Sequence, residues 1–138
     1  MKQHPRGGTA IVIGGTGGIG AAMMEALEQS GAFTEVISFS RSSEPAIDLL
    51  DEQSIARAAN WVKTRDSDLR LVFDATGFLH GTVFGPEKSL AAITPEHMLH
   101  GFAVNAVGPA LLMKHFLPLL PRHGRSVFAT LSAKVGSI

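Results

Sequence analysis

The sequence contains no cysteine and no tyrosine. Without cysteine these residues form no disulfide bond and offer no thiolate chemistry, which agrees with the cytoplasmic location that we predict. The 12 basic and 12 acidic side chains give a formal net charge of zero, so neither nucleic acid nor an anionic membrane is an expected partner. Without tyrosine, no phenol within these 138 residues can act as a general acid or base.

Apolar residues and glycine are plentiful. Hydrophobic residues make up 45% of the chain, and there are 15 glycines. This apolar content is typical of a globular protein with a buried core, and the length suits about one domain. Glycines interrupt the first apolar run, which disfavours a signal peptide, and the run is too short to span a membrane. We therefore predict a single domain over residues 1–138.

Glycines cluster at residues 14–20, which read Gly-Gly-Thr-Gly-Gly-Ile-Gly. An apolar run at 9–13 predicts a strand before them, and a helical pattern follows at 18–30. Strand, glycine turn and helix together bind the pyrophosphate of a dinucleotide, because glycine lets the backbone approach the phosphates and the helix N-terminus attracts them. The glycines fit three spacings, beginning at Gly14 or at Gly15, and do not choose among them. A P-loop is disfavoured because no Lys-Ser or Lys-Thr pair follows, and a glycine turn without a ligand is the simpler alternative.

Strands and helices alternate along the rest of the chain. Further strands are predicted at 35–39, 45–49, 69–73 and 126–131, helices at 51–63 and 95–117, and a loop at 78–93. This alternation implies a parallel sheet with right-handed crossovers. The expected fold is therefore α/β, a Rossmann-type doubly wound parallel sheet of order 3-2-1-4-5 that stops after its fifth strand.

A basic residue follows the second predicted strand, which ends in Ser40 and Arg41. Enzymes that use NAD usually have an acidic residue near this point for the ribose 2′-hydroxyl, whereas a basic residue accommodates the 2′-phosphate of NADP. Arg41 therefore indicates NADP rather than NAD. The alternative is an ordinary solvated surface arginine.

The segment at 95–117 has the clearest helix signal. Thr94 is a suitable N-cap, and Pro95 suits the first helical position. Between His100 and Lys114 the helix has no charged residue. We expect it to be buried over most of its surface, partly under the sheet and partly against a second copy of the chain in a homo-oligomer.

Asn105 lies on the stripe of this helix that we expect to be buried, and Pro109 follows at i+4. Proline has no N–H, so the carbonyl of Asn105 loses its helical partner. A buried carbonyl then needs water or another donor. The pair predicts a kink with a polar point in an apolar helix, and a plain proline kink relieved by a structural water is the alternative.

Together these features resemble the classical short-chain dehydrogenases/reductases. The pattern Gly14-x-x-x-Gly18-Ile19-Gly20 resembles the family's cofactor loop, and Ser40-Arg41 resembles its NADP-preferring site. Asp48 with Leu49 resembles the acidic-apolar pair that faces the adenine, and residues 74–77 stand where the family usually has Asn-Asn-Ala-Gly. The cofactor-binding residues that the resemblance implies are Gly14, Thr16, Gly17, Gly18, Ile19, Gly20, Ser40, Arg41, Asp48, Leu49, Ala75, Thr76 and Gly77.

The resemblance also implies the activity, which is NADP-dependent hydride transfer between the nicotinamide and a small carbonyl or alcohol substrate. Asn105, with Gly108 and Pro109, resembles the family's active-site asparagine, whose carbonyl holds a water in a proton relay. The strand leading to Ser132 resembles the one that delivers the catalytic serine. The family's serine often precedes a glycine by three residues, and counting back from Gly136 reaches Ala133. Ser132 is therefore the candidate with an offset of one residue, and Ser137 is the alternative. No metal is expected.

The family's Tyr-x-x-x-Lys motif would lie beyond Ile138, so we expect the chain to be a C-terminally incomplete, cofactor-binding part of such an enzyme. The alternative is a non-catalytic NADP-binding module or subunit. A methyltransferase that binds S-adenosylmethionine is disfavoured by Arg41, because that cofactor has no 2′-phosphate.

Overall fold

The computed structural model describes residues 7–77 and 88–132 of the chain. Its strands are β1 (Thr9–Ile13), β2 (Glu35–Phe39), β3 (Leu69–Asp74) and β4 (Val127–Thr130). Its α-helices are α1 (Gly18–Ser30), α2 (Glu52–Thr64), α3 (Pro95–Phe102) and α4 (Gly108–Phe116). Shorter helical segments are the 3₁₀ turns η1 (Leu90–Ala92) and η3 (Leu117–Leu119) and the π-helical η2 (Ala103–Val107).

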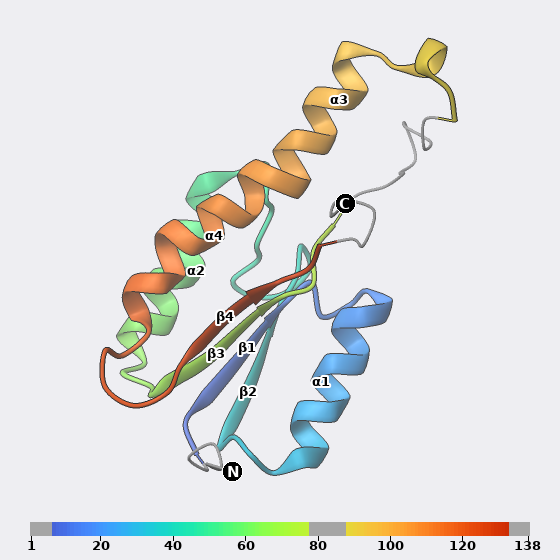
Figure 1. Ribbon diagram of the computed structural model, residues 1–138. Helices are drawn as coiled ribbons and strands as arrows, with labels where there is room; N and C mark the ends of the chain where they lie inside the picture. Colours follow the sequence, from blue (N-terminus) through green and yellow to red (C-terminus); the bar gives the residue numbers. More distant parts are fainter. Residues whose placement is uncertain (1–6, 78–87, 133–138) are drawn as a thin grey trace.

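The strands form one parallel sheet in the order β2-β1-β3-β4. Helix α1 covers one face of the sheet, and α2 and α4 cover the other (Figure 1). This is the predicted doubly wound α/β architecture. The segments at 35–39, 9–13, 69–74 and 127–130 lie side by side in the predicted order.

The strand predicted at 45–49 is wrong, because the structure has a bend and irregular backbone there, followed by a turn at Leu49 and Leu50. The N–H of Ile47 donates to the carbonyl of Ser40 at 2.9 Å, and the N–H of Asp48 donates to Oγ of Ser54 at 2.9 Å. These backbone donors are therefore not available to pair with β2. The described sheet thus lacks the outer strand of the predicted 3-2-1-4-5 order.

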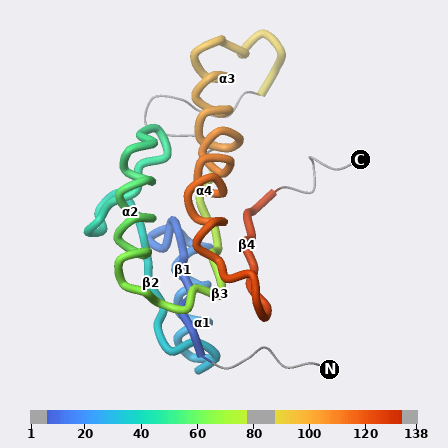
Figure 2. Tube along the Cα trace, turned by 90° about the vertical axis from the view of Figure 1, so that its left-hand side faces the viewer, coloured from blue at the N-terminus to red at the C-terminus, as the bar shows by residue number. Residues whose placement is uncertain are grey.

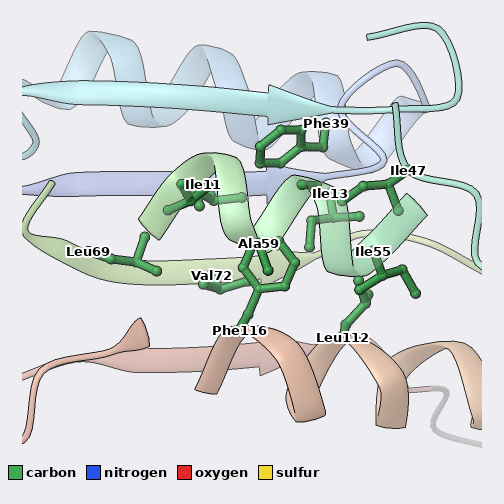
Figure 3. Packing of buried hydrophobic residues seen from close by; sticks show 12 residues of the cluster. Ile11, Ile13, Phe39, Ile47, Ile55, Ala59, Leu69, Val72, Leu112 and Phe116 are labelled. Atoms are coloured by element: carbon green, nitrogen blue, oxygen red, sulfur yellow. The ribbon is translucent and has the colours of Figure 1, made fainter. Parts of the chain in front are cut away.

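The main hydrophobic core lies between the sheet and the helices α2 and α4 (Figure 3). Every second residue of β1 points into it, as strand geometry requires, and these residues are Ile11 and Ile13. The continuous apolar pattern of β1 follows from its central place, since all five of its residues are buried. From β2 and α4, the rings of Phe39 and Phe116 meet with centroids 6.3 Å apart.

The predicted burial of the segment at 95–117 is correct only for its second half. Leu112 and Phe116 are fully buried, but Phe102 is 56% exposed and Asn105 is also exposed. The run from α3 to η3 has 25 residues, about 37 Å at about 1.5 Å per residue. The strands have 4 to 6 residues and are therefore only about 13–20 Å long. Helix α3 consequently extends past the edge of the sheet (Figures 1 and 2).

By length and composition alone, the run Pro95–Leu119 could also cross a membrane. Part of it, however, packs against α2 and the sheet through the core residues of α4. The sequence-based expectation of no membrane partner therefore stays a prediction.

Charged side chains also join α2 to α4. Glu52 Oε1 accepts from Lys114 Nζ at 2.5 Å and lies 3.0 Å from His115 Nε2. Hydrogen bonding from Lys114, and then from His115, lowers the pKa of Glu52 below its ordinary value. The group is exposed at the surface, so we regard it as an accessory to the apolar contact between the helices.

We predict that Leu112→Ala lowers the free energy of unfolding by about 2–5 kcal/mol, because it leaves a cavity beneath α4. Leu90→Ala is the matched control, since the Leu90 side chain is 88% exposed, and it should change stability by less than about 0.5 kcal/mol. Urea unfolding followed by circular dichroism measures both. Equal losses in the two variants would contradict the core described here.

Candidate functional site

The carboxyl ends of all four strands meet at one edge of the sheet. Ile13 pairs with both Phe39 and Asp74, and Asp74 pairs with Thr130. The segments that follow these residues therefore leave the sheet side by side (Figure 1). In open α/β sheets, ligands bind at this edge. Most of the predicted site residues belong to these segments.

The glycine turn after β1 has strict steric requirements at its two ends. Gly14 has φ +86°, a conformation that side chains disfavour, and its N–H donates to the carbonyl of Phe39 at 2.8 Å. At the other end, a Cβ added to Gly20 would lie 2.0 Å from the carbonyl oxygen of Gly14. Gly20 therefore lets α1 start directly against the turn. Gly14 and Gly20 are both part of two of the three glycine spacings that the sequence allows.

The middle of the turn is open. A Cβ on Gly18 would meet nothing within 4 Å, and Gly17 has its nearest such neighbour at 3.6 Å. Gly17 is the N-cap of α1 and makes no side-chain capping bond, and the first turn of the helix carries no acidic residue. The first backbone N–H groups of a helix have no partner within it. This end of α1 thus combines space with donors, as an anion requires.

A pocket of about 330 Å³ lies beside this turn. Its lining comes from the turn, from the segment after β2, from the segment after β3 and from the helical run. Predicted cofactor residues that line it are Gly14, Thr16, Gly17, Ser40, Arg41, Asp48, Leu49, Ala75, Thr76 and Gly77. The other three, Gly18, Ile19 and Gly20, are at the start of α1 and do not line it.

Serine side chains order the segment that carries Arg41. The N–H of Ser40 donates to Oγ of Ser43 at 2.9 Å, and the N–H of Ser42 donates to Oγ of Ser40 at 3.2 Å. The side chain of Arg41 is exposed and lines the pocket. A fixed turn thus presents a cation at the pocket's edge.

Asp48 lines the same pocket and is held by the start of α2. Its Oδ1 accepts from the N–H of Leu50 at 2.9 Å, and its backbone carbonyl accepts from Oγ of Ser54 at 2.9 Å. The segment that was predicted to be a strand therefore contributes Asp48 to the lining of the pocket. Leu49, beside Asp48, also packs against the core.

Asn105 lies next to the pocket without lining it. A Cβ added to Gly77, which does line the pocket, would lie 3.9 Å from Oδ1 of Asn105. The expected irregularity in the helix is present as the π-helical segment η2, in which the N–H of Gly108 donates to the carbonyl of Ala103, five residues back. Single π-helical turns inside α-helices often occur at functional sites. The expectation that Asn105 is buried is wrong, because its side chain is exposed.

Ser132 follows β4 at the same edge of the sheet and is exposed. It does not line the pocket described above. The alternative, Ser137, and the glycine used to count the spacing lie outside the described residues. The structure therefore brings most of the predicted cofactor residues to one pocket, with the two predicted catalytic residues outside its lining.

Sequence reasoning missed some of the pocket residues, which are Ile13, Ile47, Leu50, His100 and Val104. His100 and Val104 are four residues apart in one helical run and share a face. The signal was present, because His100 is one turn before Val104, which adjoins Asn105. Its role was obscured because histidines are scattered through the sequence.

Solved structures with the same architecture are numerous. One is a short-chain dehydrogenase from Streptomyces avermitilis, with a TM-score of 0.78 and 22% identity over 94% of this chain. A second is a putative carbonyl reductase, Sniffer, of Caenorhabditis elegans, with a TM-score of 0.77 and 21% identity over 96%. A third is a metagenomic short-chain oxidoreductase in complex with NADP, with a TM-score of 0.76 and 23% identity over 98%.

The fold is that of the short-chain dehydrogenases/reductases. No protein-family model and no curated protein matches the sequence, so the similarity lies in the fold. The chain spans 51%, 66% and 65% of these three structures, respectively. The resemblance inferred from the motifs is thus confirmed at the level of the short-chain dehydrogenase fold.

The glycine turn gives a direct prediction. Gly20→Ala places a methyl group against the carbonyl of Gly14, so we expect the free energy of unfolding to fall by about 1–3 kcal/mol. Gly18→Ala is the matched control in the same helix, and we expect it to change stability by no more than about 1 kcal/mol, because its methyl group meets open space. Thermal and urea unfolding measure both. Similar losses in the two variants would show that the close contact at Gly20 is not what matters.

Proposed function

We propose that this chain binds NADP in an oxidoreductase of the short-chain type, which transfers a hydride between the nicotinamide and a small carbonyl or alcohol substrate. The observation that carries the proposal is the pocket itself. It joins the glycine turn to Arg41, Asp48 and the segment after β3. Two phosphate-compatible features, an open helix N-terminus and an exposed arginine, lie at one sheet edge.

The residues fit a dinucleotide phosphate. The open side of Gly17 and Gly18 leaves room for the pyrophosphate, and the start of α1 would hold it with backbone N–H groups. Arg41 would hold the 2′-phosphate by charge-assisted hydrogen bonds, and Asp48 would accept from the adenine amine. The neighbour in complex with NADP supports the choice of cofactor class.

The chemical step would use Asn105 and Ser132. When bound, the cofactor supplies or accepts the hydride. Ser132 would hold the substrate oxygen with its hydroxyl, and the backbone of the π-helical segment around Asn105 would hold a water for proton movement. Neither side chain readily donates a proton near neutral pH, whereas turnover needs a proton donor. Cofactor binding and turnover are therefore separate parts of the proposal and need separate tests.

A second candidate is a non-catalytic NADP-binding module. The observation that favours it is the absence of tyrosine from the 138 residues. A positioned general acid contributes on the order of 10²–10⁴ in rate. NADPH binding without reduction of any carbonyl compound would favour this candidate.

Arg41→Ala should weaken NADPH binding about 10- to 100-fold, because charge-assisted hydrogen bonds are worth about 1.5–3 kcal/mol. Affinity for NADH, which lacks the 2′-phosphate, should change by less than about threefold. Fluorescence titration of both cofactors measures the effect. Arg57→Ala, on the exposed face of α2, is the matched control and should leave both affinities unchanged.

Equal losses of affinity for NADPH and NADH in Arg41→Ala would remove the basis for NADP preference.

Turnover is tested by following NADPH absorbance with a panel of aldehydes and ketones. Oxidation that falls in Ser132→Ala would support the oxidoreductase. Tight NADPH binding with no oxidation would support the non-catalytic module.

We also propose that a second copy of the chain covers the exposed apolar surface of α3 and η2, which we call the α3 surface. Its large exposed residues are Met98, Leu99, Phe102 and Val107. No aspartate, glutamate, lysine or arginine lies between Glu96 and Lys114. An exposed apolar patch without charge is typical of an interaction surface, and a twofold contact lets the same patch serve both partners.

Leu99→Glu should shift the protein toward monomer by placing charge in this contact, because burying an unpaired carboxylate is costly. Sedimentation velocity over a range of concentrations measures the shift. Leu90→Glu, at a more exposed leucine outside the α3 surface, is the matched control and should not change the distribution. A wild-type chain that stays monomeric at high concentration would refute the contact.

A further inference from the structure

Asp74 is a buried carboxylate that is not among the predicted site residues and has no part in the proposed chemistry. It ends β3, has no exposed surface and is among the largest fully buried side chains. Burying a carboxylate is expensive unless it is well hydrogen-bonded. The hydrogen-bond partners of Asp74 must therefore explain how this carboxylate is stable inside a small core.

Three donors surround this carboxylate. Oδ1 accepts from the N–H of Thr76 at 2.9 Å and from the hydroxyl of Thr76. Oδ2 accepts from the hydroxyl of Thr130 at 2.8 Å, across to the end of β4. Hydrogen bonds to an ionised acceptor are the stronger kind. We call this group of Asp74, Thr76 and Thr130 the Asp74 clamp.

The clamp fixes the wall of the pocket that faces the glycine turn. Thr76 and Gly77 line the pocket, and a Cβ added to Gly14 would lie 3.2 Å from Cγ2 of Thr76. The segment after β3 has irregular structure, so the repeated bonds of a helix or strand do not hold it. The N–H and the hydroxyl of Thr76 instead donate to Asp74. The N–H of Ala75 donates to the carbonyl of Ile13 at 2.8 Å and holds the start of the segment, so the position of Thr76 and Gly77 beyond it depends on the Asp74 carboxylate.

The clamp also reaches the other half of the site. Thr130 is the last residue of β4, two residues before Ser132. Its hydroxyl ties the end of β4 to β3 where the regular ladder stops. Among the described residues, no ion pair involves Asp74, and its carboxylate is already bonded to structural donors. These contacts suit a positioning role rather than proton transfer to a substrate.

We propose that Asp74 is a positioning residue that sets the pocket wall at Thr76 and Gly77 and the exit of β4 toward Ser132. This inference rests on the proposed function for its effect on cofactor binding. The hydrogen bonds themselves do not depend on that function. Both consequences can therefore be measured separately.

The test compares Asp74→Ala and Asp74→Asn with Val72→Ala. Asparagine can still accept from Thr76 through its amide oxygen and donate to the Thr130 hydroxyl through its amide N–H. Val72 is a fully buried residue of the same strand that does not line the pocket, so it controls for lost stability. Thr130→Val removes one bond without removing the carboxylate, which keeps the test informative if Asp74→Ala does not fold.

The first readout is amide hydrogen exchange at Thr76 in the free protein. We expect exchange at least about tenfold faster in Asp74→Ala, which loses the acceptor for the N–H of Thr76, and a smaller increase in Asp74→Asn, which keeps an acceptor there without its charge. Val72→Ala should accelerate exchange across β3 without singling out Thr76. Uniform acceleration in Asp74→Ala, or none, would overturn the clamp.

The second readout is the dissociation constant for NADPH. We expect about tenfold weaker binding for Asp74→Ala, a smaller loss for Thr130→Val, and values within about threefold of wild type for Asp74→Asn and Val72→Ala. Unchanged binding in Asp74→Ala would overturn the positioning role. If the wild-type chain itself does not bind NADPH, the proposed function fails, and exchange at Thr76 alone then decides whether the clamp exists.

Discussion

Parallel pairing of the strands is the constraint on which the site depends. Because Ile13 pairs with both Phe39 and Asp74, segments that are far apart in the sequence leave the sheet at one edge. The contact between Gly20 and the Gly14 carbonyl then fixes where α1 starts above that edge. A shift in any of these contacts would separate the helix N-terminus from Arg41. The chemistry of the pocket therefore follows from backbone geometry before any side chain acts.

The sequence predicted this edge well because its signals are local. The apolar run of β1 and the glycines after it specify strand, turn and helix within about 20 residues. The segment at 45–49 shows the limit of the same reasoning. Its short apolar pattern suits a strand, but Ser54 and Ser40 bond to its backbone groups first. The acceptors, which are the backbone carbonyl of Ser40 and the hydroxyl of Ser54, lie outside the segment, so periodicity within it could not reveal them.

The helical run shows a second limit, which concerns length rather than local bonding. An uncharged helix predicts burial, but the sequence does not state how far a partner surface extends. The sheet is shorter than the helix, so only residues near Leu112 and Phe116 reach the core. His100 and Val104 line the pocket from this same helical run. Their role depends on how α3 and η2 continue past the strand ends, which periodicity within the helix does not show.

Asp74 raises the question of how a site proposed to bind an anionic cofactor tolerates a buried carboxylate at its wall. The donors from Thr76 and Thr130 satisfy that charge locally, and the group is turned away from solvent. Arg41, by contrast, is exposed at the pocket's edge, where a long cationic side chain can reach a phosphate. The two charged groups thus act differently, because Asp74 holds the pocket wall and Arg41 would contact the ligand. A chain with no net charge can in this way present a locally favourable site for an anion, because the arrangement of its charges matters more than their sum.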